Sequence, residues 1–128
     1  MLPIKVPAEI ERYYRAYERE DLDTLEACFT EDAELRANSQ PEPVRGRESI
    51  RAYHADLLPS VRGTRLHRHR FISMPGSTAI YTEMTMRLRD RGPGHFLLTS
   101  IMVFEFDPAG LISRLLVFAD LEGAVPMD

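Results

Sequence analysis

Two histidines separated by one residue, His67 and His69, are the side chains in this sequence best suited to acid–base chemistry. Histidine titrates near neutral pH, so it can accept and return a proton. Alternate residues of a strand point to the same face, so both imidazoles could serve one site, with Asp120 as a candidate carboxylate partner. A second interpretation is a polar, partly exposed strand, because four arginines surround the pair: Arg62, Arg65, Arg68 and Arg70.

The same His-x-His spacing also suits a metal ion such as zinc. A complete site would need a third ligand, for which His95 and Asp120 are candidates along with a carboxylate elsewhere in the chain. Nothing in the sequence places such a ligand near the pair, so no metal and no cofactor is expected.

A second group of candidates is aromatic and consists of Tyr13, Tyr14, Tyr17 and Tyr53. Phenol hydroxyls inside a pocket could donate hydrogen bonds to a carbonyl or an enolate. More often, such tyrosines pack helices together while their hydroxyls reach water or the backbone. Both interpretations stay open from the spacing alone.

Helices and strands of recognisable pattern must position these side chains. Ile10, Tyr13, Tyr14 and Tyr17 have the i, i+3, i+4, i+7 spacing of one helix face, and Asp21 is a suitable N-cap for a second helix. Helices are predicted over 8–19, from 21 onward and over 47–58, and strands over 33–37, 64–73, 78–89, 96–106 and 111–118. Helices followed by antiparallel strands predict an α+β fold over one domain, residues 1–128.

The last hairpin, residues 96–118, is the most apolar part of the chain and turns at Asp107-Pro108-Ala109-Gly110. Both of its strands are apolar at odd and even positions, whereas a strand with one wet face alternates. The hairpin should therefore be covered on both faces. One face needs helices or a cavity, and the other needs a second sheet or a second subunit.

Composition excludes several classes of function. The 128 residues include 16 basic and 20 acidic side chains, a net charge of −4, which argues against a nucleic-acid binder. The apolar runs are too short for a membrane span, and the N-terminal stretch lacks the apolar core of a secretory signal. The single cysteine, Cys28, cannot form an intramolecular disulfide and is expected to be buried. A cytoplasmic protein is expected.

Four phrases of the sequence, in this order, resemble the nuclear transport factor two-like superfamily: AYEREDLDTLEACF, TEDAEL, VRGRESIRAYHADL and VFEFDPAGLISRLLVFADL. Within it, the chain is most similar to the SnoaL-like branch of polyketide cyclases, ketosteroid isomerases and limonene epoxide hydrolases. The resemblance implies a cone: a strongly curved, mainly antiparallel sheet around a cavity, closed by three N-terminal helices. It also implies dimers formed through the outer sheet face. We expect a small apolar organic ligand and a role in small-molecule or secondary metabolism.

The catalytic residues of these relatives carry over only in part. Tyr13 matches the tyrosine donor of the ketosteroid isomerases, but Ala37 and Met102 occupy the positions of their two carboxylic acids. The ionisable groups of the epoxide hydrolases correspond here to Met84, Met86 and Val117. Asn38 resembles their water-holding asparagine.

The resemblance also implies which side chains point into the cone. The implied lining on the last three long strands includes Thr82, Met84, Met86, Ser100, Met102 and Val117. A four-residue turn at 74–77 would add Phe71, His69 and His67, while a slip by one residue would turn both histidines outward. Tyr17 and Tyr53 are expected at the ligand from the helices, and Arg36 and Asn38 at the mouth. Ile101 and Val103 fall on the outer face, which predicts a homodimer.

The sequence thus favours an isomerase, cyclase or dehydratase acting on an apolar substrate. His67 or His69 would shuttle the proton, assisted by Tyr13 or Asp120. The main alternative is a binding module of the same fold without chemistry, which the loss of both carboxylate sets favours. A third interpretation is a structural dimerisation domain whose cavity is filled by its own side chains.

Overall fold

The computed structural model describes residues 5–38 and 40–127, and its helices lie mostly where the sequence predicts them. Helix α1 covers Ala8–Glu18 and α2 covers Leu22–Ala27. Helix α3 covers Arg47–Leu57 and continues as a short 3-10 turn, Leu58–Ser60. The predicted N-cap is confirmed, because the Asp21 side chain accepts a hydrogen bond from the backbone N–H of Thr24 at 3.2 Å.

The strands form one sheet with the order β2-β1-β6-β5-β4-β3, and β7 pairs with β5. Their bounds are Phe29–Ala37 (β1), Val44–Arg45 (β2), Val61–Met74 (β3), Ser77–Met86 (β4), Phe96–Phe106 (β5), Ile112–Ala119 (β6) and Val125–Pro126 (β7). Strand β1 runs parallel to β6, and every other pairing of the described strands is antiparallel. A second 3-10 turn, Arg89–Arg91, lies between β4 and β5.

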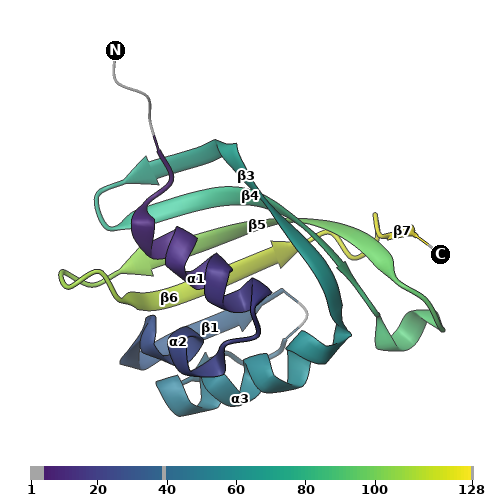
Figure 1. Cartoon of the computed structure of the whole chain (residues 1–128), viewed down its shortest axis with the longest axis horizontal. Helices are drawn as coiled ribbons and strands as arrows, with labels where there is room; N and C mark the ends of the chain where they lie inside the picture. Colours follow the sequence, from purple (N-terminus) through teal and green to yellow (C-terminus); the bar gives the residue numbers. More distant parts are fainter. Residues whose placement is uncertain (1–4, 39, 128) are drawn as a thin grey trace.

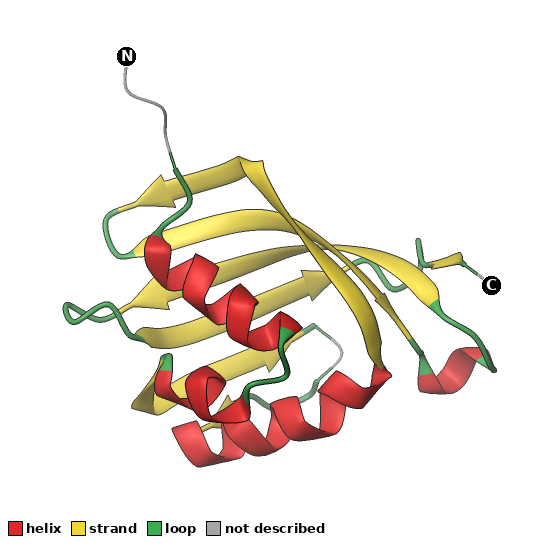
Figure 2. Ribbon diagram, viewed as in Figure 1, coloured by secondary structure: helices red, strands yellow, loops and turns green. Residues whose placement is uncertain are grey.

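The predicted α+β architecture is confirmed. The three helices pack on one side of a curved, mostly antiparallel open sheet (Figure 1). Figure 2 shows α1 crossing in front of the long strands while α3 lies along the lower edge. Of the helices in the described residues, none covers the other side of the sheet.

Some element boundaries differ from the prediction because pairing overrides local pattern. Strand β1 begins at Phe29, four residues before the predicted start, since Phe29 pairs with Ile112 of β6. Strand β3 extends at both ends, to Val61 and Met74, along its partner β4. The two-residue strands β2 and β7 were not predicted, because so short a segment carries no periodicity.

The hairpin turn between β5 and β6 has the conformation that its sequence predicts. Gly110 takes a φ of 85°, in the left-handed region where glycine is favoured. The Asp107 carboxylate accepts hydrogen bonds from the backbone N–H groups of Ala109 and Leu111, at 3.0 and 2.9 Å. The turn therefore fixes the register of β5 and β6, which lie next to each other in the middle of the sheet.

The predicted inward face is confirmed on strands β4, β5 and β6. Thr82 lies opposite Ser100, which lies opposite Ala119, so these residues share the concave face. Met102 lies between Ile80 and Val117 on the same face. Side chains of this face, together with those of α1 and α3, form the core and the cavity.

Strand β3 breaks this regularity. Phe71 lies opposite Ile80 as predicted, but the next registered pair is Leu66 with Thr82. Four residues of β3, 67–70, thus lie opposite Tyr81 alone, and this bulge adds three residues to one strand. An odd number of extra residues reverses the alternation of faces. Leu66 is therefore the inward residue, and the predicted inward orientation of His67 is wrong.

Candidate functional site

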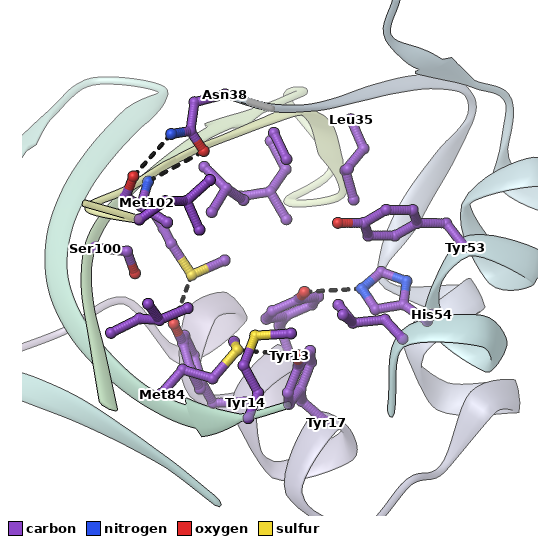
Figure 3. Close-up of a pocket in the computed structure, with 18 of the residues that line it drawn as sticks. Tyr13, Tyr14, Tyr17, Leu35, Asn38, Tyr53, His54, Met84, Ser100 and Met102 are labelled. Atoms are coloured by element: carbon purple, nitrogen blue, oxygen red, sulfur yellow. Dashed lines mark hydrogen bonds between the residues drawn. The ribbon is translucent and has the colours of Figure 1, made fainter. Parts of the chain in front are cut away.

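A cavity of about 190 Å³ lies between the concave face of the sheet and the helices α1 and α3. Helix α1 contributes Tyr13, Tyr14 and Tyr17 to its wall, and α3 contributes Tyr53 and His54. Figure 3 shows these aromatic side chains gathered on one side, with Met84, Ser100 and Met102 of the sheet facing them. The site is thus built from one helix face and one strand face that meet.

Tyr13 and His54 form a hydrogen-bonded pair at the wall of this cavity. The Tyr13 hydroxyl lies 2.9 Å from Nε2 of His54, and both residues are buried, at 2% and 1% exposure. Nδ1 of His54 lies 2.9 Å from the backbone carbonyl oxygen of Ile50. Because a carbonyl oxygen can only accept, Nδ1 carries the hydrogen and Nε2 accepts from the Tyr13 hydroxyl.

Burial fixes the charge of this pair. Desolvation lowers the pKa of His54 below its usual value, so the imidazole is neutral near pH 7. Desolvation also raises the pKa of Tyr13 well above 10, so the phenol keeps its proton. The result is a neutral phenol held against a neutral base, with the phenol oxygen at the cavity.

A second chain of hydrogen bonds crosses from α1 to the sheet. The hydroxyls of Thr82 and Ser100 lie 2.5 Å apart. The Tyr14 hydroxyl donates to the sulfur of Met102 at 2.7 Å. The first of these hydrogen bonds joins β4 to β5, and the second joins α1 to β5.

The Asn38 side chain closes the end of β1 against β6. Its Nδ2 donates to the carbonyl oxygen of Ala119 at 2.7 Å, and its Oδ1 accepts from the N–H of Ala119 at 3.4 Å. Asn38 borders the cavity and is exposed, as expected for a residue at the mouth (Figure 3). Both polar atoms of its amide are thus hydrogen-bonded to the backbone of β6.

The rest of the wall is apolar. It includes Met84, Met86, Leu98, Met102 and Val117 from the concave face of the sheet. Among the described residues, none of those that line the cavity is Asp, Glu, Lys or Arg. A charged ligand group would therefore lose its hydration without gaining a counter-charge.

The structure brings together most of the residues predicted to contact a ligand. Those that line the cavity are Tyr13, Tyr17, Asn38, Tyr53, Met84, Met86, Ser100, Met102 and Val117. Thr82 and Phe71 have the predicted inward orientation but do not line the cavity: Thr82 is buried and bonds to Ser100 on the neighbouring strand, and Phe71 packs against the core. Arg36 is exposed on β1 and is not part of the wall.

The predicted acid–base groups on β3 and after β6 lie outside the cavity. Nε2 of His67 lies 2.5 Å from a carboxylate oxygen of Glu83, and its ring packs edge-on against Tyr81. His69 is exposed at a surface groove beside Arg12. The Asp120 carboxylate is also exposed and accepts from the N–H of Gly123 at 2.9 Å. The bulge in β3 explains the two histidines, and the turn that follows β6 explains Asp120.

Sequence reasoning missed His54, the histidine that does line the cavity. Its signal was its position on α3, four residues after Ile50, which is 0% exposed. Residues at i and i+4 share a helix face, so a buried Ile50 implies a buried residue 54. The apolar pattern drew attention instead to Tyr53 and Leu57, because histidine does not count as apolar.

Within residues 5–38 and 40–127, no three His, Cys, Asp or Glu side chains lie close enough together to hold a metal ion. Over the same residues, no helix has the length and apolar character needed to cross a membrane.

The sequence profile of the SnoaL-like domain matches residues 10–115 of this chain. No curated protein matches this chain. Among solved structures, the epoxide hydrolase/cyclase-like enzyme SalBIII, described in pyran ring formation in the polyether salinomycin, is similar with a TM-score of 0.81. The identity is 19%, over 94% of this chain and 94% of that one.

A second similar structure is an LEH-like epoxide hydrolase from Mycobacterium tuberculosis, with a TM-score of 0.72 and 20% identity. That match covers 90% of this chain and 82% of the other. At these identities the two likenesses establish a shared fold, and a shared fold does not imply a shared reaction.

Proposed function

Because this chain belongs to the SnoaL-like domain family, we propose that it transforms a small, mainly apolar organic molecule by acid–base catalysis in the cone cavity. The reaction would be an isomerisation, cyclisation or dehydration, each of which needs one proton removed and one returned. The observation that carries this proposal is the buried Tyr13–His54 pair at the cavity wall. The proton-transfer role proposed here thus falls to His54 rather than to His67 or His69.

The pair can act as a relay. The Tyr13 oxygen accepts a proton from the substrate while its own proton passes to Nε2 of His54. The hydrogen on Nδ1 of His54 stays in its hydrogen bond to the carbonyl oxygen of Ile50. The resulting imidazolium returns the proton through Tyr13 to another atom of the same molecule, so the pair ends as it began. Because burial disfavours the charged state, the imidazolium is short-lived and a strong acid for the return step.

The cavity wall supports the proposed substrate class. Three methionines adapt to irregular apolar shapes, and the absence of charged side chains among the described lining residues disfavours an ionic substrate. A dry cavity also holds the reacting groups in one orientation, which itself accelerates the reaction. The neighbours SalBIII and the LEH-like hydrolase act, by their descriptions, in ring formation and on epoxides, which fits this class.

An exchange experiment tests the proposal without knowledge of the natural substrate. Apolar cyclic ketones such as 1-indanone are incubated in D₂O, and loss of the α-hydrogen signal is followed by NMR. The wild type should accelerate exchange, and Tyr13→Phe and His54→Gln should each reduce it by about 100-fold. His67→Ala and His69→Ala serve as matched controls and should retain wild-type exchange.

The alternative function is a binding module without chemistry. It is favoured by the lack of any carboxylate among the described lining residues. Ketones that bind the wild type but exchange no faster than in buffer would support this alternative and contradict the relay. The third interpretation, a filled cavity, is disfavoured by the open volume of about 190 Å³.

Two further parts of the proposal concern the setting of the protein. The outer face of the sheet, which none of the described helices covers, supports a homodimer, with Ile101 and Phe118 exposed by 47% and 54% at its centre. A cytoplasmic location and a role in secondary metabolism complete the proposal, the latter supported by the polyether context of SalBIII.

A further inference from the structure

The hydroxyls that line the cavity differ in whether the protein already satisfies them. Tyr13 donates to His54, Tyr14 donates to Met102, and the hydroxyls of Ser100 and Thr82 bond to each other. The Tyr13 and Tyr14 hydroxyls would have to break a bond within the protein in order to donate to a ligand, and the Ser100 hydroxyl already has a partner in Thr82 behind it.

Tyr53 is the exception. Its hydroxyl has no hydrogen-bond partner among the residues that the structure describes, although its ring packs edge-on against His54 with a centroid distance of 5.7 Å. Figure 3 shows this hydroxyl directed into the cavity from α3. Burial raises the pKa of Tyr53 above its usual value, so the phenol keeps its hydrogen and is a donor. The Tyr53 side chain is only partly buried and lines the cavity, so its hydroxyl hydrogen is available to an acceptor there.

Tyr17 is the one competing donor among the described tyrosines of the wall. Its hydroxyl lies 4.0 Å from the sulfur of Met84, at the outer limit of a hydrogen bond to sulfur. Tyr17 is 5% exposed and is packed against Tyr13 and Tyr14 on its own helix. It therefore has a weak partner already, whereas Tyr53 has none.

From this inventory we infer that Tyr53 recognises one hydrogen-bond-accepting oxygen of an uncharged ligand, such as a ketone, an ether or an epoxide. The inference rests on the proposed function in taking this cavity as the ligand site, but it concerns binding and not turnover. The rings of Tyr53 and His54 are in contact at the cavity wall, so an oxygen bound to Tyr53 would lie on the same side of the cavity as the relay. Polarising that oxygen would also make hydrogens on the neighbouring carbon more acidic.

Three probes of matched shape test the inference. They are 1-indanone, the hydrocarbon indane, which lacks the oxygen, and indane-1-carboxylate, which carries a charge. Dissociation constants are measured by NMR titration of the wild type and of three variants: Tyr53→Phe, Tyr17→Phe and Tyr13→Phe.

The expected result is specific to one variant and one probe. Tyr53→Phe should weaken 1-indanone binding by about fivefold to tenfold, the worth of one hydrogen bond, and change indane binding by less than about twofold. Tyr17→Phe and Tyr13→Phe should leave the ratio of 1-indanone to indane affinity unchanged. The carboxylate should bind at least about tenfold more weakly than 1-indanone.

Two results would overturn the inference. In the first, Tyr53→Phe keeps the wild-type ratio of 1-indanone to indane affinity; in the second, the carboxylate binds the wild type as tightly as 1-indanone does. Loss of the ratio in Tyr17→Phe instead would assign the oxygen to that tyrosine. Failure of the proposed relay would give a different result. Tyr13→Phe would then exchange the α-hydrogens of 1-indanone as fast as the wild type, while the affinities of all three probes would stay as stated.

Discussion

His54 carries a consequence for stability as well as for chemistry. It is 1% exposed, and desolvation lowers its pKa in the folded protein below the ordinary value of 6.5. The unfolded chain therefore binds more protons than the folded protein once the pH falls below about 6.5. The contribution of neutral His54 to stability is complete above that pH and is lost as the pH drops toward the folded pKa.

Denaturant unfolding at about pH 7.5, 6.5 and 5.5 tests this prediction. The free energy of unfolding of the wild type should fall below pH 6.5 by up to about 1.4 kcal/mol per pH unit from His54 alone. His54→Gln, which cannot charge, should show a correspondingly smaller fall, whereas His69→Gln, at an exposed position, should follow the wild type. Equal pH dependence in wild type and His54→Gln would contradict the burial argument.

At the residue scale, the sequence predicts the apolar wall of the cavity better than its polar centre. Met84, Met102 and Val117 could be placed because strand alternation is regular wherever the register is unbroken. The role of His54 could not be predicted, since it depends on Tyr13, a partner 41 residues away in the sequence that no local pattern reveals.

At the element scale, β3 decides which histidine reaches the cavity. Its bulge places Leu66 inward at 7% exposure and turns His67 to Glu83 on the outer face. Figure 1 shows β3 as a long strand that bends across the sheet, and a bulge accommodates such a bend. The sequence contains no glycine or proline between residues 64 and 74 that would have indicated this bulge.

A pair of alanine variants tests this reversal of faces. Leu66→Ala should lower the free energy of unfolding by about 2–3 kcal/mol, because it removes a packed side chain from the core. His67→Ala should cost less than about 1 kcal/mol, the usual value for an ion pair that stays partly in contact with water. Denaturant unfolding of the two variants against the wild type gives both numbers. The opposite order would mean that β3 keeps the regular alternation.

At the scale of the whole molecule, the two faces of the sheet differ in what covers them. The helices and the cavity occupy the concave face, while the outer face carries a row of apolar residues that no helix in the described part of the chain covers. Tyr81, Ile101 and Phe118 lie opposite one another on neighbouring strands of that face. Ile101 and Phe118 remain 47% and 54% exposed, which is costly for large apolar side chains at the centre of a sheet.

A second copy of the chain is the simplest cover for this row, because a two-fold axis places the same patch against itself. Light scattering coupled to size-exclusion chromatography should give twice the monomer mass for the wild type. Ile101→Lys should give the monomer, since it would bring two ammonium groups together in a buried apolar interface. Ala55→Lys, at an exposed position of α3 on the helix side, is the matched control and should remain dimeric. A monomeric wild type, or a dimer that persists in Ile101→Lys, would contradict this use of the outer face. The exchange and binding tests apply equally to a monomer, because the described wall of the cavity comes from a single chain.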